Sequence, residues 1–307
     1  MEKTEKRILY PSQKVLEFFH LEKGSRIALT ACSNGLSKEK ESQIADVCQA
    51  FEKMGLHPVI SPCFYERYNV FSGTAKERAK ILMDAYQDPD IAGIFDLSGG
   101  DLANEILDFL DYEAIARARK PFWGYSDLTC LLNAIYARTD VSGGLWQAKN
   151  LAGPFGACQA EAFASSVFDG KNGLFEISAA PIQGIHQGES LEGILVGGNV
   201  RCLLKLAGTP YLPDFEGKLL FLESWAGGAA RITALFSQLS QMGVFRKIKG
   251  LILGTFTEMD EKKEQPDAVQ LAVQIVDDPA LPIFKTGQAG HGKDSRALPV
   301  GETVLLK

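Results

Sequence analysis

The sequence predicts an α/β protein of two domains, an N-terminal domain around a parallel, Rossmann-like sheet and a smaller C-terminal α/β domain. Short apolar runs typical of strands alternate with longer amphipathic patterns typical of helices along most of the chain. This alternation indicates parallel sheets with helices on both faces. With 307 residues, of which 46% are hydrophobic, the chain is long enough to bury two cores.

The first half begins with an apolar strand at residues 25–30, followed by a helix that Ser37 caps. One face of this helix carries apolar residues at helical spacing: Ile44, Val47, Cys48, Phe51 and Met54. A short strand is expected at residues 58–60. Thr74 and Glu77 then form a capping-box pattern, which predicts the start of the next helix.

Two further strands end in loops that are candidates for chemistry. Residues 91–97 form an apolar strand that is followed by Ser98-Gly-Gly-Asp101, and a second apolar run stops at Gly124. Ligands bind beyond the carboxyl ends of parallel strands, so we expect both loops at the same edge of the sheet. The glycine pair in the first loop can bring backbone N–H groups close to a ligand, but it is also typical of an ordinary turn.

Ser126 occupies the corner between the strand that stops at Gly124 and a helix expected over residues 127–138. A serine on such a turn projects its hydroxyl group from the sheet edge. The N–H groups of the new helix then face the group that the serine attacks, as in a nucleophile elbow. Alternatively, Ser126 or Asp127 only caps the helix, since both residue types are preferred caps. Gly-x-Ser-Asp alone leaves both interpretations open.

Turn-forming residues gather near the middle of the chain. Residues 169–173 and 179–184 contain Gly, Asn, Asp and Pro between periodic segments. We therefore predict an N-terminal domain over residues 1–170, a crossover over residues 171–185 and a C-terminal domain over residues 186–307.

The second half repeats the alternation of strands and helices. Strands are expected at residues 191–196, 218–223, 250–256 and 281–284, and helices at residues 200–206, at 266–277 and around the apolar face of Ile232, Leu235, Phe236, Leu239 and Met242. Glu223 ends one of these strands, where its carboxylate either lies in solvent or needs a partner. His291 lies in a Gly-rich loop over residues 287–292, an unusual place for a core histidine.

Composition argues against several classes of protein. The net charge of −6 offers no basic surface for nucleic acid. The apolar runs are too short for a membrane span and the charged N-terminus lacks the apolar stretch of a signal peptide, so we expect a cytoplasmic protein. Six cysteines without a Cys-x-x-Cys pair and four histidines without a His-Glu-x-x-His motif predict neither disulfides nor a metal site. No cofactor is expected.

Ser126, Glu223 and His291 together supply a nucleophile, an orienting carboxylate and a base. We predict that His291 takes the proton of Ser126 and later protonates a leaving amine, while Glu223 orients the imidazole. The backbone N–H groups of Gly100 and Asp127 are the expected donors to the oxyanion.

The chain resembles the LD-carboxypeptidase serine peptidases, a family that includes the microcin C immunity peptidases. The resemblance covers nearly the whole chain and rests on these motifs: Ser98-Gly-Gly-Asp101, Gly124-Tyr-Ser-Asp-Leu-Thr129, Gly197-Gly-Asn199, Gly208-Thr-Pro-Tyr211, Lys218-Leu-Leu-Phe-Leu-Glu223, and Gly290-His-Gly292 followed by Leu298-Pro-Val-Gly301. It implies a metal-free hydrolase with Ser126, Glu223 and His291 at the catalytic positions. It also implies a two-domain α/β fold and, in many members, a homodimer.

The substrate that the resemblance implies is the LD-amide bond to the terminal D-alanine of a murein tetrapeptide, cut during cytoplasmic wall recycling. The alternative is an immunity-type peptidase that cleaves a peptidyl or aminoacyl nucleotide, which base stacking on Trp146 or Trp225 would favour. A noncatalytic small-ligand binding protein of the same fold is a third possibility. Asp101 and Trp146 are candidate substrate-binding residues; the alternative for Trp146 is a place in the core. Arg231, or else Arg201, is expected to bind the free terminal carboxylate.

Overall fold

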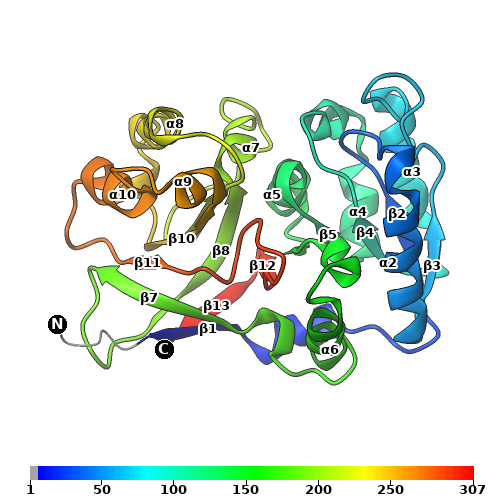
Figure 1. Cartoon of the computed structure of the whole chain (residues 1–307), viewed down its shortest axis with the longest axis horizontal. Helices are drawn as coiled ribbons and strands as arrows, with labels where there is room; N and C mark the ends of the chain where they lie inside the picture. The colour runs from blue at the N-terminus through cyan, green and yellow to red at the C-terminus, as the bar shows by residue number, and fades with distance from the viewer. Residues whose placement is uncertain (1–5) are drawn as a thin grey trace.

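The computed structural model describes residues 6–307, whose strands form a six-stranded sheet and a closed barrel (Figure 1). The sheet has the order β12-β6-β5-β4-β2-β3, and its neighbouring strands are parallel except for β12 with β6. Its strands are β2 (Arg26–Thr30), β3 (His57–Ile60), β4 (Ile91–Asp96), β5 (Phe122–Gly124), β6 (Gly143–Leu145) and β12 (Leu298–Val300). The parallel strands of this sheet agree with the parallel α/β domain that the sequence predicted.

Helices cover both faces of the six-stranded sheet. Phe95 and Trp123 pack on one face, together with α1 (Gln13–Phe18), α2 (Glu41–Lys53) and α6 (Gly156–Val167). Their strand neighbours Ile94 and Phe122 pack on the other face, because successive strand side chains point to opposite sides. That face is covered by α3 (Ala75–Gln87), α4 (Tyr112–Ala118) and α5 (Thr129–Thr139). No helix within residues 6–307 has the length and apolar composition to span a lipid bilayer.

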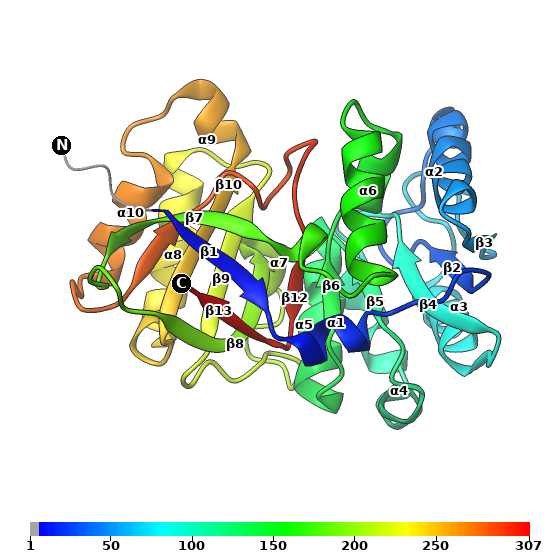
Figure 2. The ribbon, with the colours of Figure 1, turned by 90° about the horizontal axis from the view of Figure 1, so that it is seen from below.

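The barrel has the strand order β1-β13-β8-β9-β10-β11-β7 and closes where β1 pairs with β7 (Figure 2). Its strands are β1 (Arg7–Pro11), β7 (Ile177–Gln183), β8 (Leu191–Asn199), β9 (Leu219–Ser224), β10 (Gly250–Phe256), β11 (Ile283–Lys285) and β13 (Thr303–Leu306). The run from β8 to β11 is parallel, and the remaining pairings are antiparallel. An apolar cluster joins this parallel run to the helices α7 (Val200–Leu204), α8 (Ala229–Gln241), α9 (Thr257–Lys262) and α10 (Ala268–Val276).

The two halves of the chain exchange strands, which the sequence did not predict. β1 precedes the first strand of the six-stranded sheet but lies in the barrel, and β12 comes from the last residues but pairs with β6. β7 lies in the expected crossover and is itself a barrel strand. The strand exchange crosses the predicted boundary at residues 171–185. The sequence did not predict this exchange because it depends on pairings between distant segments, which no local pattern encodes.

A cluster of large aromatic side chains forms the core between the six-stranded sheet and α6. The rings of Phe95 and Trp123 stack with centroids 5.5 Å apart, and those of Trp146 and Phe163 stack at 5.2 Å. Trp123 also contacts Trp146 edge to face at 5.9 Å. All four side chains are almost completely buried, so they contribute a large apolar area to this core.

We predict that Phe163→Ala lowers the free energy of unfolding by about 3–5 kcal/mol, because it leaves a cavity beside two tryptophans. Chemical denaturation followed by tryptophan fluorescence measures the change. The matched control is Phe155→Ala, since Phe155 is 47% exposed immediately before α6. Its effect should stay within about 0.5 kcal/mol. Equal effects of the two substitutions would contradict the placement of Phe163 in the core.

Candidate active site

Ser126 lies on a sharp turn between β5 and α5. Its backbone has a φ of +55°, in the left-handed region that is strained for a serine. The chain can turn this tightly because Gly124 has no side chain: a Cβ atom at that position would lie 2.6 Å from Cβ of Leu128. A short 3-10 turn over Ser126–Leu128 leads into α5. This is the strand–turn–helix geometry expected of a nucleophile elbow.

Ser126, His291 and Glu223 form one hydrogen-bonded chain of side chains. The Ser126 Oγ atom lies 3.2 Å from His291 Nε2, and His291 Nδ1 lies 2.6 Å from Glu223 Oε2. Glu223 is 1% exposed, so the imidazole meets a carboxylate that is shielded from water. The carboxylate favours the imidazole tautomer with its proton on Nδ1, which leaves Nε2 free to accept the serine proton.

Neighbouring side chains hold Glu223 in place. Asn199 lies opposite it in the β8–β9 register and donates a 2.9 Å hydrogen bond from Nδ2 to Oε1. The Tyr125 hydroxyl group donates to Oε2 at 3.4 Å. Burial, together with the nearby Glu223 carboxylate, raises the pKa of Tyr125 well above its usual range, so Tyr125 stays a donor.

His291 is positioned by the loop that carries it. Its backbone N–H donates to Thr255 Oγ1 at 3.1 Å. The loop can approach Thr255 this closely because Gly290, at φ +135°, has no side chain: a Cβ atom there would lie 1.9 Å from the same oxygen. The Gly-His-Gly pattern therefore reflects a close backbone contact beside the histidine.

The helix that follows Ser126 packs directly against the end of β8. Asn133 donates to the Gly197 carbonyl group and accepts from the Gly197 N–H, both at 2.9 Å. A Cβ atom at Gly198 would lie 2.5 Å from Thr129 Oγ1. The Gly197-Gly-Asn199 motif thus allows α5 to approach the barrel strand that also supplies the partner of Glu223.

A cavity of about 480 Å³ opens beside Ser126 and His291. The loop after β4 lines it through Ser98 and Gly99, which confirms that this loop and the elbow meet at one sheet edge. Trp225 also lines the cavity, is 54% exposed, and has its ring centroid 5.2 Å from that of His291. A ligand in this cavity would therefore meet the serine, the histidine and an exposed indole ring.

The backbone positions expected to donate to the oxyanion follow two neighbouring strands, Gly100 after β4 and Asp127 after β5, and neither residue is among those that line the cavity. Gly100 has a φ of +122°, and a Cβ atom there would lie 2.2 Å from Asn34 Cγ, so only glycine fits this turn. The preceding residue, Gly99, contacts the cavity directly. The backbone of Asp127 follows Ser126 at the start of the 3-10 turn.

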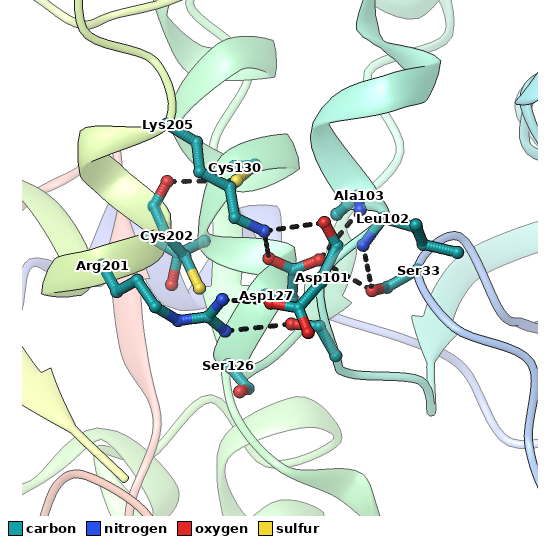
Figure 3. A network of polar contacts seen from close by, with 12 residues as sticks. Ser33, Asp101, Leu102, Ala103, Ser126, Asp127, Cys130, Arg201, Cys202 and Lys205 are labelled. Atoms are coloured by element: carbon teal, nitrogen blue, oxygen red, sulfur yellow. Dashed lines mark hydrogen bonds and ion pairs between the residues drawn. The ribbon is translucent and has the colours of Figure 1, made fainter. Parts of the chain in front are cut away.

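The side chain of Asp127 is the centre of a buried polar network (Figure 3). Its Oδ2 atom accepts hydrogen bonds from Ser33 Oγ at 2.7 Å and from the Ala103 N–H at 2.8 Å. Its Oδ1 atom lies 2.5 Å from Lys205 Nζ, at the end of α7. The residue after the candidate nucleophile is therefore tied by an ion pair to the helix that follows β8.

Asp101 and Arg201 pair with each other at the edge of the same network. The Arg201 guanidinium group pairs with the Asp101 carboxylate and also donates to the Gly100 carbonyl group at 3.0 Å. This hydrogen-bonded pairing lowers the pKa of Asp101. Both side chains were expected to contact substrate, but each already has a partner of opposite charge.

The structure corrects two further expectations about substrate binding. Trp146 is 1% exposed and its indole N–H donates to Gln159 Oε1 at 3.0 Å, so its ring belongs to the core and has no face free for a ligand. Arg231 is exposed on the first turn of α8, with its aliphatic part against Gly227, and is not among the residues that line the cavity. Its closeness to Glu223 in sequence does not bring it to the site.

Three lysines in the cavity lining were missed at the sequence level: Lys40, Lys149 and Lys293. Lys293 could have been found from its position two residues after His291, but nothing local marks the other two. Within residues 6–307, no three His, Cys, Asp or Glu side chains form a group that could hold a metal ion. Metal-free chemistry stays a prediction.

Comparison with known proteins places this chain among carboxypeptidases. Residues 27–145 match the family model described as the LD-carboxypeptidase N-terminal domain, and residues 192–306 match the LD-carboxypeptidase C-terminal domain. The Escherichia coli microcin C7 self-immunity protein MccF is 28% identical over 265 residues, which are 76% of each chain. The Pseudomonas aeruginosa murein tetrapeptide carboxypeptidase is 28% identical over 249 residues, 78% of this chain and 80% of that protein.

Solved structures have the same overall fold. The structure of MccF in complex with glutamyl sulfamoyl guanosine superposes with a TM-score of 0.81 at 22% identity, over 94% of this chain and 97% of that chain. A muramoyltetrapeptide carboxypeptidase from Oxalobacter formigenes superposes with a TM-score of 0.74 at 23% identity, over 92% and 98%. The mixed α/β architecture described above is therefore shared with these proteins.

We predict that Lys205→Met destabilises the protein by about 3–5 kcal/mol, because it leaves the fully buried Asp127 carboxylate without its cation. Arg201→Met is the matched control, since it removes the same charge from the exposed pair with Asp101. That change should cost about 0–1 kcal/mol. Denaturant unfolding of both variants measures the difference. If Lys205→Met lowers the free energy of unfolding no more than Arg201→Met, the buried pair does not hold α7 to the turn that carries Ser126.

Proposed function

Because the chain belongs to the LD-carboxypeptidase family, we propose that it is a metal-independent serine carboxypeptidase that releases the terminal D-alanine of murein-derived peptides. The observation that supports this proposal most strongly is the chain of contacts from Ser126 through His291 to Glu223, with separations of 3.2 Å and 2.6 Å. These are the distances that proton transfer from a serine hydroxyl group requires. The same chain of contacts argues against a noncatalytic binding protein.

In the proposed mechanism, Ser126 Oγ attacks the scissile carbonyl carbon while His291 Nε2 takes the hydroxyl proton. Glu223 stabilises the imidazolium that forms. The backbone N–H groups of Asp127 and of the Gly99-Gly100 turn donate to the negative oxygen of the tetrahedral intermediate, each contributing about 10²–10³-fold. His291 then protonates the leaving amine, which departs as D-alanine. Water, activated by the same histidine, releases the remaining peptide from Ser126.

A second candidate function is cleavage of an aminoacyl or peptidyl nucleotide. The exposed ring of Trp225 favours it, because an indole in the cavity beside His291 could stack on a base. Relatives of this chain include a microcin C7 self-immunity protein. Comparing hydrolysis of a murein tetrapeptide with that of an aminoacyl sulfamoyl nucleoside by the purified protein separates the two functions.

The remaining expectations are part of the same proposal. We propose a homodimer and a cytoplasmic location on the strength of the family resemblance, and a functional division in which the N-terminal part supplies Ser126 and the C-terminal part supplies Glu223 and His291. Size-exclusion chromatography with light scattering measures the oligomeric state directly.

We predict that Ser126→Ala and His291→Ala each lower kcat by about 10³–10⁶-fold on the murein tetrapeptide, and that the double variant loses no more than the single ones. The reason is that both side chains act in one proton transfer. The matched controls are Ser42→Ala and His20→Ala, because both residues are exposed and lie outside the cavity lining. Near-normal turnover by either active-site variant would reject the proposed triad.

A further inference from the structure

The cavity beside Ser126 carries an excess of positive charge. Lys40, Lys149 and Lys293 all line it. They come from three separate segments: the end of the 3-10 turn Lys38–Lys40, the 3-10 turn Ala148–Ala152, and the loop after His291. The lining contains one acidic residue, Asp96.

The Asp96 carboxylate is held by hydrogen bonds from other groups and pairs directly with none of these lysines. It accepts hydrogen bonds from Thr30 Oγ1 at 2.8 Å, from the Cys32 N–H at 2.7 Å and from the Ser98 N–H at 2.9 Å. Burial raises the pKa of Asp96, and the hydrogen bonds from Cys32 and Ser98 act in the opposite direction. Within residues 6–307, neither Asp96 nor any other carboxylate forms an ion pair with a lysine of the cavity.

Lys149 is the most shielded of these cations. It is partly buried, and loss of contact with water is the main reason why its pKa is lowered. Repulsion from Lys40 lowers the pKa further, and attraction to Asp96 acts in the opposite direction. No hydrogen bond or ion pair holds its ammonium group in the part of the chain that the structure describes. A cation that has lost water and has no direct ion-pair partner is suited to an anion that arrives with a ligand.

Hydrogen bonds from Asn150 tie the turn that carries Lys149 to the loop that carries His291. The next residue, Asn150, is 4% exposed and donates from Nδ2 to the Gly292 carbonyl group at 3.1 Å and to Ser295 Oγ at 3.2 Å. These bonds join the turn that carries Lys149 to the loop that carries His291 and Lys293. The turn that carries Lys149 is therefore held in one position relative to the loop that carries His291.

We propose that Lys149, flanked by Lys40 and Lys293, binds the anionic group that the substrate carries beside its scissile amide bond. This inference rests on the proposed hydrolase function and names its substrate class: acyl compounds whose leaving group is negatively charged. In a carboxypeptidase that anion is the free α-carboxylate of the departing residue. An acyl sulfamoyl or phosphoryl nucleotide presents an anionic or strongly polar acceptor at the same place. Lys149 takes the role that the sequence suggested for Arg231.

The test compares a murein tetrapeptide that ends in a free D-alanine carboxylate with the same peptide ending in a carboxamide. Lys149→Met should lower kcat/KM for the free acid by about 10–100-fold, the usual range for losing one charge-assisted hydrogen bond, and change that for the amide by less than about two-fold. Lys149→Gln should show the same division between substrates. Wild-type protein should prefer the free acid by a similar factor.

Arg231→Met is the matched control, because it removes one positive charge from an exposed position outside the cavity lining. Its kcat/KM should stay within about two-fold of wild type on both peptides. Thermal unfolding at pH 7 checks the fold. A lysine whose pKa is lowered by folding costs stability while it is charged, so Lys149→Met should unfold at a temperature no lower than wild type.

Equal losses on the acid and the amide would overturn the proposal, and so would the absence of any loss on the two peptides and on an acyl sulfamoyl adenosine substrate. A loss confined to an acyl sulfamoyl adenosine substrate would support the site and identify a nucleotide as the source of the anion. The hydrolase function is judged separately, by Ser126-dependent turnover of either peptide. If the wild-type protein hydrolyses neither peptide, calorimetry compares the binding of D-alanine with that of D-alaninamide. Binding of D-alanine alone that is lost in Lys149→Met supports the proposed role of Lys149. Any other pattern rejects that role.

Discussion

The proposed site requires the six-stranded sheet and the barrel to keep one relative position. Ser126 follows β5 of the sheet, whereas Glu223 lies on β9 of the barrel and His291 follows β11. The hydrogen bond between Ser126 Oγ and His291 Nε2 therefore crosses from one unit to the other. Catalytic groups must be held to within about 0.5 Å, so a small shift between the two sheets would separate the serine from its base.

Several contacts of different kinds fix that position. One apolar cluster runs without interruption from α3, α4 and α5 into the barrel interior, and the exchanged strands β1 and β12 tie each unit to the chain of the other. The buried pair of Asp127 with Lys205 adds a directional contact immediately beside Ser126. A buried ion pair stabilises a fold little compared with apolar residues of the same size, so we interpret this one as fixing the geometry of the elbow.

The sequence could predict that Ser126, Glu223 and His291 meet, because each of them lies at or beyond the end of a strand. Gly124 and Ser126 end one apolar run, Glu223 ends another, and His291 lies in a loop rich in glycine; parallel strands bring such ends to one edge. The barrel could not be predicted, because β1, β7 and β13 pair with strands from distant parts of the chain.

The contacts of individual side chains could not be predicted from the sequence either. A tryptophan near a candidate site fits both a core and a ligand contact, and only the stacking of Trp146 on Phe163 decides between them. Closeness in sequence suggested Arg231, whereas folding brings Lys149 to the cavity from an unrelated segment. The charges that meet a substrate depend on tertiary packing, which local patterns do not contain.

The most direct measurement of the central claim is mass spectrometry of the protein after reaction with a fluorophosphonate, a reagent that modifies activated serines. Covalent attachment to Ser126, abolished by heat unfolding, is expected because His291 and Glu223 activate this hydroxyl group only in the folded protein. No modification, or modification confined to other serines, would contradict the assignment of Ser126 as the nucleophile.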